Sequence, residues 1–238
     1  MEAPQLLPVF KVVIVGAEQS GKTSLATRFG GKYDEHTAPP PTIGVDFSIY
    51  RPTDASGNVY QLQVWDTAGA AKFAAVVDAY FGSANALLAV VDLNELEEAA
   101  HAVMASTADV VRARLAGLYR ALGRFDESRR QRPFVAVVGA KWDLVAERPA
   151  EYMIGRAELR RQAAELRATY WDCSARQNIN VSAPFDALTA ALIDVAQRER
   201  RVTALRSARP SAPEWARTAW TEMLTDPTTS RASSSCCC

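Results

Sequence analysis

The sequence predicts an α/β fold, with a six-stranded, mostly parallel sheet flanked by helices and a flexible C-terminal tail. Two observations lead to this prediction. Apolar runs typical of buried strands alternate with helical segments through most of the 238 residues, and parallel strands need such connections. The first apolar run also leads directly into residues 16–23, whose spacing G-x-x-x-x-G-K-T is that of the phosphate-binding P-loop.

The first half of the chain is expected to contain three strands and one helix. Residues 10–15 are a nearly continuous apolar run, which is typical of a buried strand, and residues 24–29 follow the glycine-rich loop as a helix. Residues 45–51 and 59–65 are the next two strands. The segment 52–58 between them is rich in turn residues, so we expect an antiparallel hairpin.

The second half alternates strands with helices, which predicts parallel strands with helices on both faces of the sheet. The strands are expected at 86–91, 134–138 and 170–173, and the helices at 96–122, 158–168 and 183–201. From Arg206 on, Pro, Ser, Thr and Arg accumulate, as in a tail. We therefore predict one domain over residues 1–201 and a tail over residues 202–238.

Composition excludes several classes of protein. The 27 basic and 27 acidic residues balance, so nothing suggests nucleic-acid binding. No run of about 18 apolar residues is present, and the N-terminus lacks the pattern of a signal peptide. Glu2 stands where N-myristoylation requires glycine. The four cysteines offer no disulfide framework, which fits a reducing cytosol.

Residues 16–23 are suited to bind the phosphates of a nucleotide. Their backbone N–H groups can turn inward, and the following helix adds the positive end of its dipole. Lys22 would reach the β- and γ-phosphates, and the Thr23 hydroxyl would ligate Mg²⁺. The nucleotide-contacting residues expected here are Gly16, Glu18, Gln19, Ser20, Gly21, Lys22, Thr23 and Ser24. An ordinary glycine turn would not explain the Lys-Thr pair.

Four segments downstream of the loop carry further chemistry. They are residues 42–47, 65–69, 139–143 and 173–176. Asp66 ends a strand and can hold Mg²⁺ through water, as a Walker B acid does. Gly69 stands where a bare backbone N–H could approach a γ-phosphate.

With these segments in order, the chain resembles the Ras-superfamily small GTPases, and within them the Rab family, from about Phe10 to Arg200. Such GTPases share a P-loop, a switch threonine, a D-x-x-G segment, an N-K-x-D segment and an S-A-K loop. Residues 43–47, Ile-Gly-Val-Asp-Phe, match the effector-facing segment of Rab proteins without change. Residues 61–65 and 79–84 are close to two other Rab segments. The resemblance implies a Ras-like P-loop NTPase fold.

The resemblance also implies roles at the matching positions. Thr23, Thr42 and Asp66 would bind Mg²⁺, Thr42 in the GTP state, and Gly69 would hydrogen-bond the γ-phosphate. The catalytic set would be Lys22, Thr42 and Gly69. Asp143 would accept hydrogen bonds from guanine N1 and N2. The remaining base-side residues would be Lys141, the amides of Ser174, Ala175 and Arg176, and Tyr33 or Phe29 beside the base.

Phe47, Trp65 and Tyr80 fall where Rab proteins carry an aromatic triad that effectors contact. Ile43 and Phe73 would face effectors as well. Aromatic residues in strands commonly pack in the core. The matching flanking residues favour a partly exposed binding surface instead.

Four positions depart from the family pattern, three of them with a clear expected effect. Ala70 replaces the glutamine that orients the attacking water, so intrinsic hydrolysis is expected to be slow. Glu18 replaces a small residue near the γ-phosphate, where it would repel phosphate unless it points to solvent. Ala140 replaces the asparagine of N-K-x-D, which predicts weaker nucleotide binding. Arg176 in place of lysine is a milder change.

The chain ends in Cys236, Cys237 and Cys238, after Ser235 at the position where a C-a-a-X box needs cysteine. The resemblance implies geranylgeranylation by a transferase with the Rab escort protein, and two lipid chains would anchor stably. Accidental cysteines or a redox or metal cluster are the alternatives. Residues 215–224 have the pattern of a short amphipathic helix, although a disordered stretch has the same composition.

These features predict a monomeric GTP/GDP switch with Mg²⁺, slow GTP hydrolysis and a role in vesicle trafficking. It would be cytoplasmic and peripheral on an intracellular membrane. Its partners would be effectors, an exchange factor and a GTPase-activating protein. One alternative is a pseudo-GTPase, a membrane-anchored interaction module with little or no turnover. A P-loop kinase or ATPase is another, which the match at residues 42–47 disfavours.

Overall fold

The computed structural model describes residues 8–102, 106–125 and 132–207. The predicted lipidation sites Cys236, Cys237 and Cys238 and the amphipathic segment 215–224 lie outside the described residues. Contacts divide the chain into two units, Met1–Val195 and Ala196–Cys238. The sheet and all nucleotide-site residues discussed below belong to the first unit, and the predicted division after Arg201 stays a prediction.

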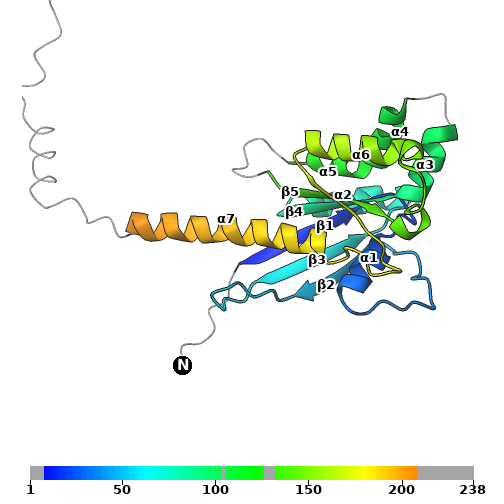
Figure 1. Cartoon of the computed structure of the whole chain (residues 1–238). Coiled ribbons are helices and arrows are strands. Elements are labelled where there is room, and N and C mark those ends of the chain that lie inside the picture. The colour runs from blue at the N-terminus through cyan, green and yellow to red at the C-terminus, as the bar shows by residue number, and fades with distance from the viewer. Residues whose placement is uncertain (1–7, 103–105, 126–131, 208–238) are drawn as a thin grey trace, which may run out of the picture. The chain divides into compact units, whose positions relative to one another are not determined.

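Six strands form a single sheet in the order β2-β3-β1-β4-β5-β6 (Figure 1). Their bounds are Val9–Val15 (β1), Val45–Tyr50 (β2), Gln61–Thr67 (β3), Ala86–Asp92 (β4), Phe134–Ala140 (β5) and Thr169–Asp172 (β6). All neighbouring pairs are parallel except β2 and β3, which are antiparallel. The predicted six-stranded, mostly parallel sheet with one hairpin is therefore confirmed, although β3 begins two residues later than its expected start at 59.

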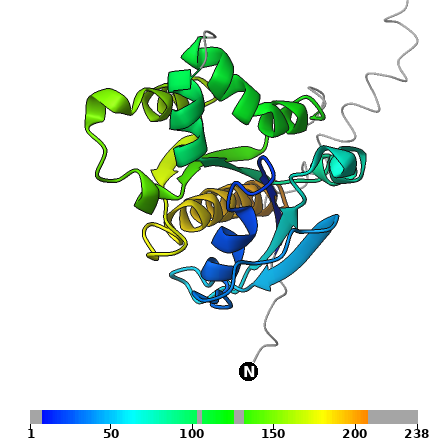
Figure 2. The same cartoon turned by 90° about the vertical axis from the view of Figure 1, so that its right-hand side faces the viewer.

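Helices lie on both faces of this sheet (Figure 2). They are Lys22–Phe29 (α1), Ala74–Phe81 (α2), Leu93–Ala102 (α3), Thr107–Arg114 (α4), Ala116–Leu122 (α5), Ile154–Glu165 (α6) and Ala183–Ser207 (α7), with short 3₁₀ turns at Ala71–Phe73, Trp142–Leu144 and Ala150–Tyr152. Helices α2 to α6 pack over one face in a shared apolar cluster. On the other face, Phe29 of α1 stacks on Phe185 of α7 with ring centroids 4.0 Å apart. Central strand β4 is consequently buried at every position.

The prediction of one helix over residues 96–122 is wrong, because α3, α4 and α5 occupy this region. Ser106 starts a new helix at α4. Its Oγ accepts a hydrogen bond from the backbone N–H of Asp109 (3.2 Å) and donates one to the Asp109 carboxylate (2.7 Å). A serine in this role favours a helix start over a helix interior. The sequence interpretation also missed α2.

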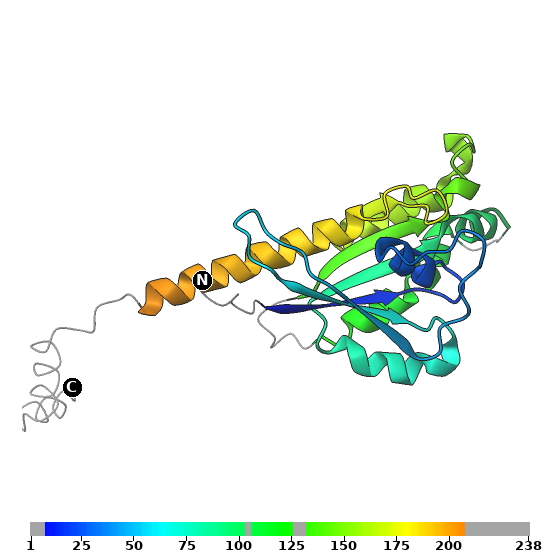
Figure 3. The same cartoon turned by 90° about the horizontal axis from the view of Figure 1, so that it is seen from below.

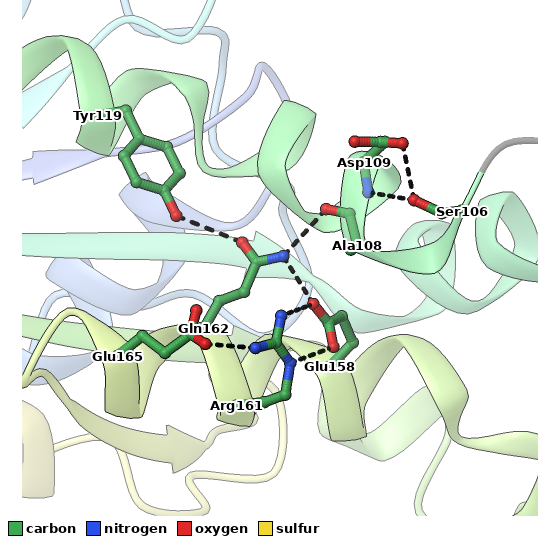
Figure 4. A network of polar contacts seen from close by, with 8 residues as sticks. All are labelled: Ser106, Ala108, Asp109, Tyr119, Glu158, Arg161, Gln162 and Glu165. Atoms are coloured by element: carbon green, nitrogen blue, oxygen red, sulfur yellow. Dashed lines mark hydrogen bonds and ion pairs between the residues drawn. The ribbon is translucent and has the colours of Figure 1, made fainter.

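A polar network joins α4, α5 and α6 (Figure 4). Gln162 is 3% exposed, and its side-chain amide donates to Ala108 O (2.9 Å) and Glu158 Oε1 (2.8 Å). Its Oε1 accepts a hydrogen bond from the Tyr119 hydroxyl (3.3 Å). On the solvent side, Arg161 donates to both carboxylate oxygens of Glu158, each at 2.7 Å. Because both polar atoms of the buried Gln162 amide make hydrogen bonds, the network joins the three helices at little desolvation cost.

Helix α6 begins four residues before its predicted start at 158, because a carboxylate from another helix caps it. Glu97 of α3 is fully buried, and it accepts hydrogen bonds from Gly155 N (3.0 Å) and Arg156 N (2.6 Å). The residue before the helix, Met153, makes no side-chain cap. Glu97 therefore satisfies backbone donors that the first turn of a helix leaves free.

We expect a Glu97→Ala substitution to lower the free energy of unfolding by about 3 kcal/mol, because it strands two buried N–H groups. Urea unfolding followed by circular dichroism measures this change. Glu98→Ala on the exposed side of α3 is the matched control, and it should leave the midpoint nearly unchanged. Similar losses in the two variants would contradict the assigned capping role.

No helix within the described residues combines the length and apolar character needed to cross a membrane. The carboxyl end of β1, helix α1 and the connection 30–44 lie together at one end of the sheet (Figure 3). Parallel strands bring their loops to a common edge, where ligands of such folds bind.

Candidate nucleotide-binding site

The P-loop connects β1 to α1 through a tight backbone path. A Cβ atom at Gly16 would lie 2.3 Å from Val90 O of β4, so the loop can pass this close to the sheet because the residue is glycine. Gly21 (φ 97°) and Gln19 (φ 60°) both have left-handed backbone. The hydroxyl of Ser20 is buried and lacks a hydrogen-bond partner in the described part of the chain. An unpaired buried polar atom in such a loop is suited to a ligand.

Lys22 brings its charge into the loop. The residue is 5% exposed, and its Nζ donates to Gly16 O (3.1 Å) and Ala17 O (2.5 Å). Burial lowers the pKa of Lys22, and the nearby charges of Asp66 and Glu18 partly offset that effect. A desolvated ammonium beside a glycine-rich loop is suited to bind phosphate oxygens.

Three side chains with oxygen atoms that could ligate a metal come from separate segments and meet next to the loop. Thr23 Oγ1 donates to Asp66 Oδ2 at 2.6 Å and lies 2.8 Å from Thr42 Oγ1. Thr42 Oγ1 also donates to Asp66 Oδ2 at 3.3 Å. These segments are the start of α1, the connection before β2, and β3, so the fold brings together the predicted magnesium residues. Hydroxyl and carboxylate oxygens are hard donors, which Mg²⁺ prefers.

Of these three possible metal ligands, Asp66 is the one whose charge a bound cation would stabilise. Its second oxygen, Oδ1, is buried and has no hydrogen-bond partner among the described residues. Burial raises the pKa of the Asp66 carboxyl, and bonds from Thr23 and the charge of Lys22 oppose the rise. A divalent cation at this position would favour the ionised form. The residues present therefore fit Mg²⁺.

The backbone at Gly69 lies directly on the P-loop. A Cβ atom there would be 2.4 Å from Glu18 N and 2.5 Å from Ala17 O, so a side chain cannot fit without displacing backbone. This contact brings the predicted γ-phosphate ligand to the loop. The next residue, Ala70, carries a methyl group that can neither donate nor accept a hydrogen bond. Glu18 is exposed, the orientation in which its charge is least disturbing.

The two predicted base-reading loops are bonded to each other. Ser174, fully buried, donates through Oγ to Asp143 Oδ1 at 2.6 Å. Trp142 N donates to Cys173 O at 3.0 Å. Lys141 has left-handed backbone (φ 59°), and its ammonium pairs with Asp92 Oδ2 at 2.6 Å. These contacts keep the Asp143 carboxylate at the carboxyl edge of the sheet.

The two aromatic residues predicted beside the base lie in different surroundings. Phe29 stacks on Phe185 of α7, and its ring centroid lies 4.6 Å from that of Tyr50 of β2. The Tyr33 ring lies 4.9 Å from the Arg28 guanidinium carbon, and the position of either ring beside the base stays a prediction. Ala175 and the exposed Arg176 follow Ser174 in the turn, where Gln177 N donates to Ser174 Oγ at 3.0 Å.

The predicted aromatic triad is contiguous in the structure. Phe47 and Trp65 are cross-strand partners with ring centroids 5.0 Å apart, and Trp65 lies 5.1 Å from Tyr80 of α2. Phe47 is 42% exposed, and Ile43 beside it is 82% exposed. Phe73 is half-buried against the core. The triad thus exposes Phe47 to solvent, while Trp65 packs between Phe47 and Tyr80.

Sequence reasoning missed two residues at these sites. Lys11 of β1 places its Nζ 4.3 Å from the Trp65 ring centre and 5.2 Å from that of Tyr80. No local pattern distinguishes this lysine from any other polar residue on a strand. Asp92, the partner of Lys141, ends β4, and an acid at the carboxyl end of a strand is a signal that could have found it.

The chain matches the Ras family over residues 11–194. It is 35% identical over 184 residues to the Ras-related protein Rab-36 of Mus musculus, covering 77% of this chain and 62% of that protein. It is 32% identical over 174 residues to the Ras-related protein Rab-34 of Rattus norvegicus, covering 73% and 60%. It is 30% identical over 205 residues to the Ras-related protein Rab-30 of Homo sapiens, covering 85% and 89%.

The matched part of the chain thus spans about three fifths of the length of the Rab-36 and Rab-34 proteins. The family match covers the P-loop, the threonine and aspartate cluster and both base-reading loops. The chain therefore belongs to the Ras family, as a Rab-like small GTPase of the Ras superfamily.

Proposed function

We propose that this protein is a Rab-like switch in vesicle trafficking that binds GTP and GDP with Mg²⁺ and recruits effector proteins in its GTP state. The observation that best supports this function is the convergence of Thr23, Thr42 and Asp66 within 3.3 Å of one another beside the buried Lys22. These four groups come from three segments that the sheet brings to one edge. Such a cluster is suited to hold a cation and phosphates together.

Each group has a distinct task in this proposal. Lys22 and the loop amides bind the phosphates, and Mg²⁺, when bound, neutralises developing charge on the phosphate oxygens. Thr42 and Gly69 respond to the γ-phosphate, because both lie on segments that contact the P-loop side of the site. Loss of that phosphate would release both segments, which is a change that effectors can sense.

The base is bound by Asp143 in the same proposal. Its carboxylate accepts hydrogen bonds from the N1–H and the 2-amino group of guanine. Adenine has neither of these donors. Ser174 keeps the carboxylate in place through its 2.6 Å hydrogen bond. A site built on such hydrogen bonds rejects the wrong base strongly, since a mismatched base leaves buried polar groups unpaired.

The membrane part of the proposal rests on the sequence. Geranylgeranyl groups on cysteines among Cys236, Cys237 and Cys238 would anchor the protein to the cytosolic face of an intracellular membrane. A Rab escort protein and a geranylgeranyl transferase would act at that end. Effectors would meet the exposed edge of the aromatic triad, where large apolar side chains are accessible.

A second candidate is a pseudo-GTPase that binds partners with little or no turnover. Two positions support it. Ala70 cannot position a water molecule, and Ala140 faces Gly21 of the P-loop with a methyl group that cannot hydrogen-bond to it. Turnover with and without a GTPase-activating protein separates this module from a slow but working switch.

The proposed function is tested by binding of fluorescent GDP and GTP to the purified full chain with Mg²⁺, competed by ATP. Tight binding that unlabelled GTP displaces and ATP does not is the expected result. Chelation of Mg²⁺ with EDTA should also speed GDP release, because Thr23 would hold the cation close to the negative phosphates. Equal displacement by ATP, or no binding, would overturn the proposal.

An Ala70→Gln variant is expected to hydrolyse bound GTP about ten- to hundredfold faster than the wild type, since the new amide can orient the attacking water. Phosphate release from GTP-loaded protein in a single turnover measures the rate. Ala71→Gln is the matched control, because Ala71 is an exposed neighbour at the start of the same turn. Equal rates in the two variants would show that hydrolysis is limited elsewhere in the site.

A further inference from the structure

Arg156 contacts both segments that carry the base-reading loops, although no pattern in the sequence marks it. Its Nε and Nη2 donate to Asp172 Oδ1 (3.0 Å) and Oδ2 (2.7 Å), which is a bidentate pair. Its Cζ also lies 4.9 Å from the ring centre of Trp142. A planar guanidinium is suited to pair with a carboxylate and face an aromatic ring at the same time.

The arginine is itself held in place. Its backbone N–H donates to the buried Glu97 at 2.6 Å, at the first turn of α6. The hydrogen bonds with Asp172 raise the pKa of Arg156, so it stays charged. Asp172 Oδ1 additionally accepts a hydrogen bond from the Tyr170 hydroxyl at 2.6 Å. These contacts restrict the side chains on both sides of the pair.

The two contacts of Arg156 lead directly to the base-reading residues. Trp142 immediately precedes Asp143, and Asp172 ends the strand that leads into Cys173 and Ser174. The loops are joined again by Trp142 N to Cys173 O (3.0 Å) and by Ser174 Oγ to Asp143 Oδ1 (2.6 Å). Arg156 therefore closes a ring of contacts behind the Asp143 carboxylate.

The P-loop side of the same loop has a weaker link in this chain. Ala140 faces Gly21 with a methyl group, which would lie 3.6 Å from a Cβ built at the glycine. A methyl group cannot hydrogen-bond to the loop, so Ala140 cannot fix the orientation of its segment against the P-loop in that way. The orientation of Asp143 consequently depends on its hydrogen bond from Ser174 and on the neighbouring residues Trp142 and Asp172, which Arg156 contacts.

We propose that Arg156 is a positioning residue that orients residues 139–143 and 173–176 and thereby sets how long, and how selectively, guanine is retained. This inference rests on the proposed function of the site. Arg156 makes its effect through Trp142 and Asp172, and the nucleotide is contacted by Asp143. The guanine 2-amino group, which that carboxylate binds, is the part of the ligand most sensitive to its orientation.

The test is the dissociation of fluorescent GDP and the affinities for GDP and inosine diphosphate in full-length Arg156→Ala. Inosine lacks the 2-amino group. We expect GDP to dissociate about tenfold faster and the preference for GDP over the inosine nucleotide to fall by a similar factor. Arg161→Ala is the matched control, because Arg161 is on the same helix and also pairs with both oxygens of a carboxylate, that of Glu158. Arg161→Ala should match the wild type in both the rate of GDP dissociation and the preference for GDP over inosine diphosphate.

Arg156→Lys supplies the second measurement if the alanine variant does not fold. Lysine keeps the charge but cannot form the planar bidentate pair, so a smaller loss of guanine preference is expected. The inference is overturned if the altered Arg156 protein behaves like Arg161→Ala, or if GDP and inosine diphosphate weaken by the same factor. Absence of GDP binding by the wild type would instead overturn the proposed function itself.

Discussion

An Asp143→Asn variant is expected to bind GDP at least about 100-fold more weakly than the wild type and to gain affinity for xanthosine diphosphate. The asparagine amide donates where the carboxylate accepts, so it opposes the 2-amino group of guanine. Xanthine carries an oxygen at that position, which matches the new donor. The effect is large because buried hydrogen-bonding groups left unpaired are costly.

The structure indicates that this substitution changes recognition and leaves the fold intact. Ser174 donates to Asp143 Oδ1 at 2.6 Å, and the carbonyl oxygen of asparagine can accept the same hydrogen bond. Displacement titrations with GDP and xanthosine diphosphate give the two affinities. Glu147→Gln, an exposed acid close to the loop, is the control. Unchanged GDP affinity in Asp143→Asn would show that the carboxylate does not face the base.

The second large effect is expected from Lys22→Met, which should lower GTP affinity by at least about 100-fold, equivalent to about 2.7 kcal/mol. The lysine is 5% exposed and faces the carbonyls of the P-loop. A buried cation interacts with phosphate charge in a low-dielectric setting, where its removal is expensive. Methionine fills a similar volume without the charge.

The same substitution should leave the nucleotide-free protein about as stable as the wild type. Burial already lowers the pKa of Lys22, so its removal also relieves the cost of desolvating an ammonium. Urea unfolding without nucleotide and GTP titration together separate binding from folding. Lys72→Met, at an exposed position, is the control for both measurements. A loss of GTP binding explained by a lower unfolding midpoint would contradict this account.

The parts of the fold that follow local patterns were predictable. Nearly continuous apolar runs predicted β1, β4 and β5, because a strand buried on both faces is apolar almost throughout. The mixed sequences of β2, β3 and β6 were recognised from their place in the strand and helix alternation. The helix boundaries were less predictable. Ser106 interrupts the predicted helix over residues 96–122, and its capping role depends on the backbone conformation around Asp109. The start of α6 was displaced because its cap, Glu97, comes from a distant part of the chain.

The candidate site shows the same division. Motif spacing predicted phosphate and Mg²⁺ roles for Lys22 and Thr23, because a loop between a strand and a helix constrains which atoms can meet a phosphate. The base-binding role of Asp143 is what the resemblance to small GTPases implies. The spacing could not give the 2.8 Å approach of Thr42 to Thr23, which depends on how residues 30–44 return to the sheet. Nor could it show that Phe29 packs on Phe185.

The sequence by itself determined the strands, the P-loop and the resemblance to small GTPases, since each depends on residue types within a few positions of one another. Tertiary structure decided which distant groups meet. Lys141 pairs with Asp92, and Arg156 joins Trp142 to Asp172. Such pairs are fixed by the order of strands in the sheet and by helix packing against it. Strand order and helix packing are not encoded in local spacing, because both arise from the burial of the whole apolar core.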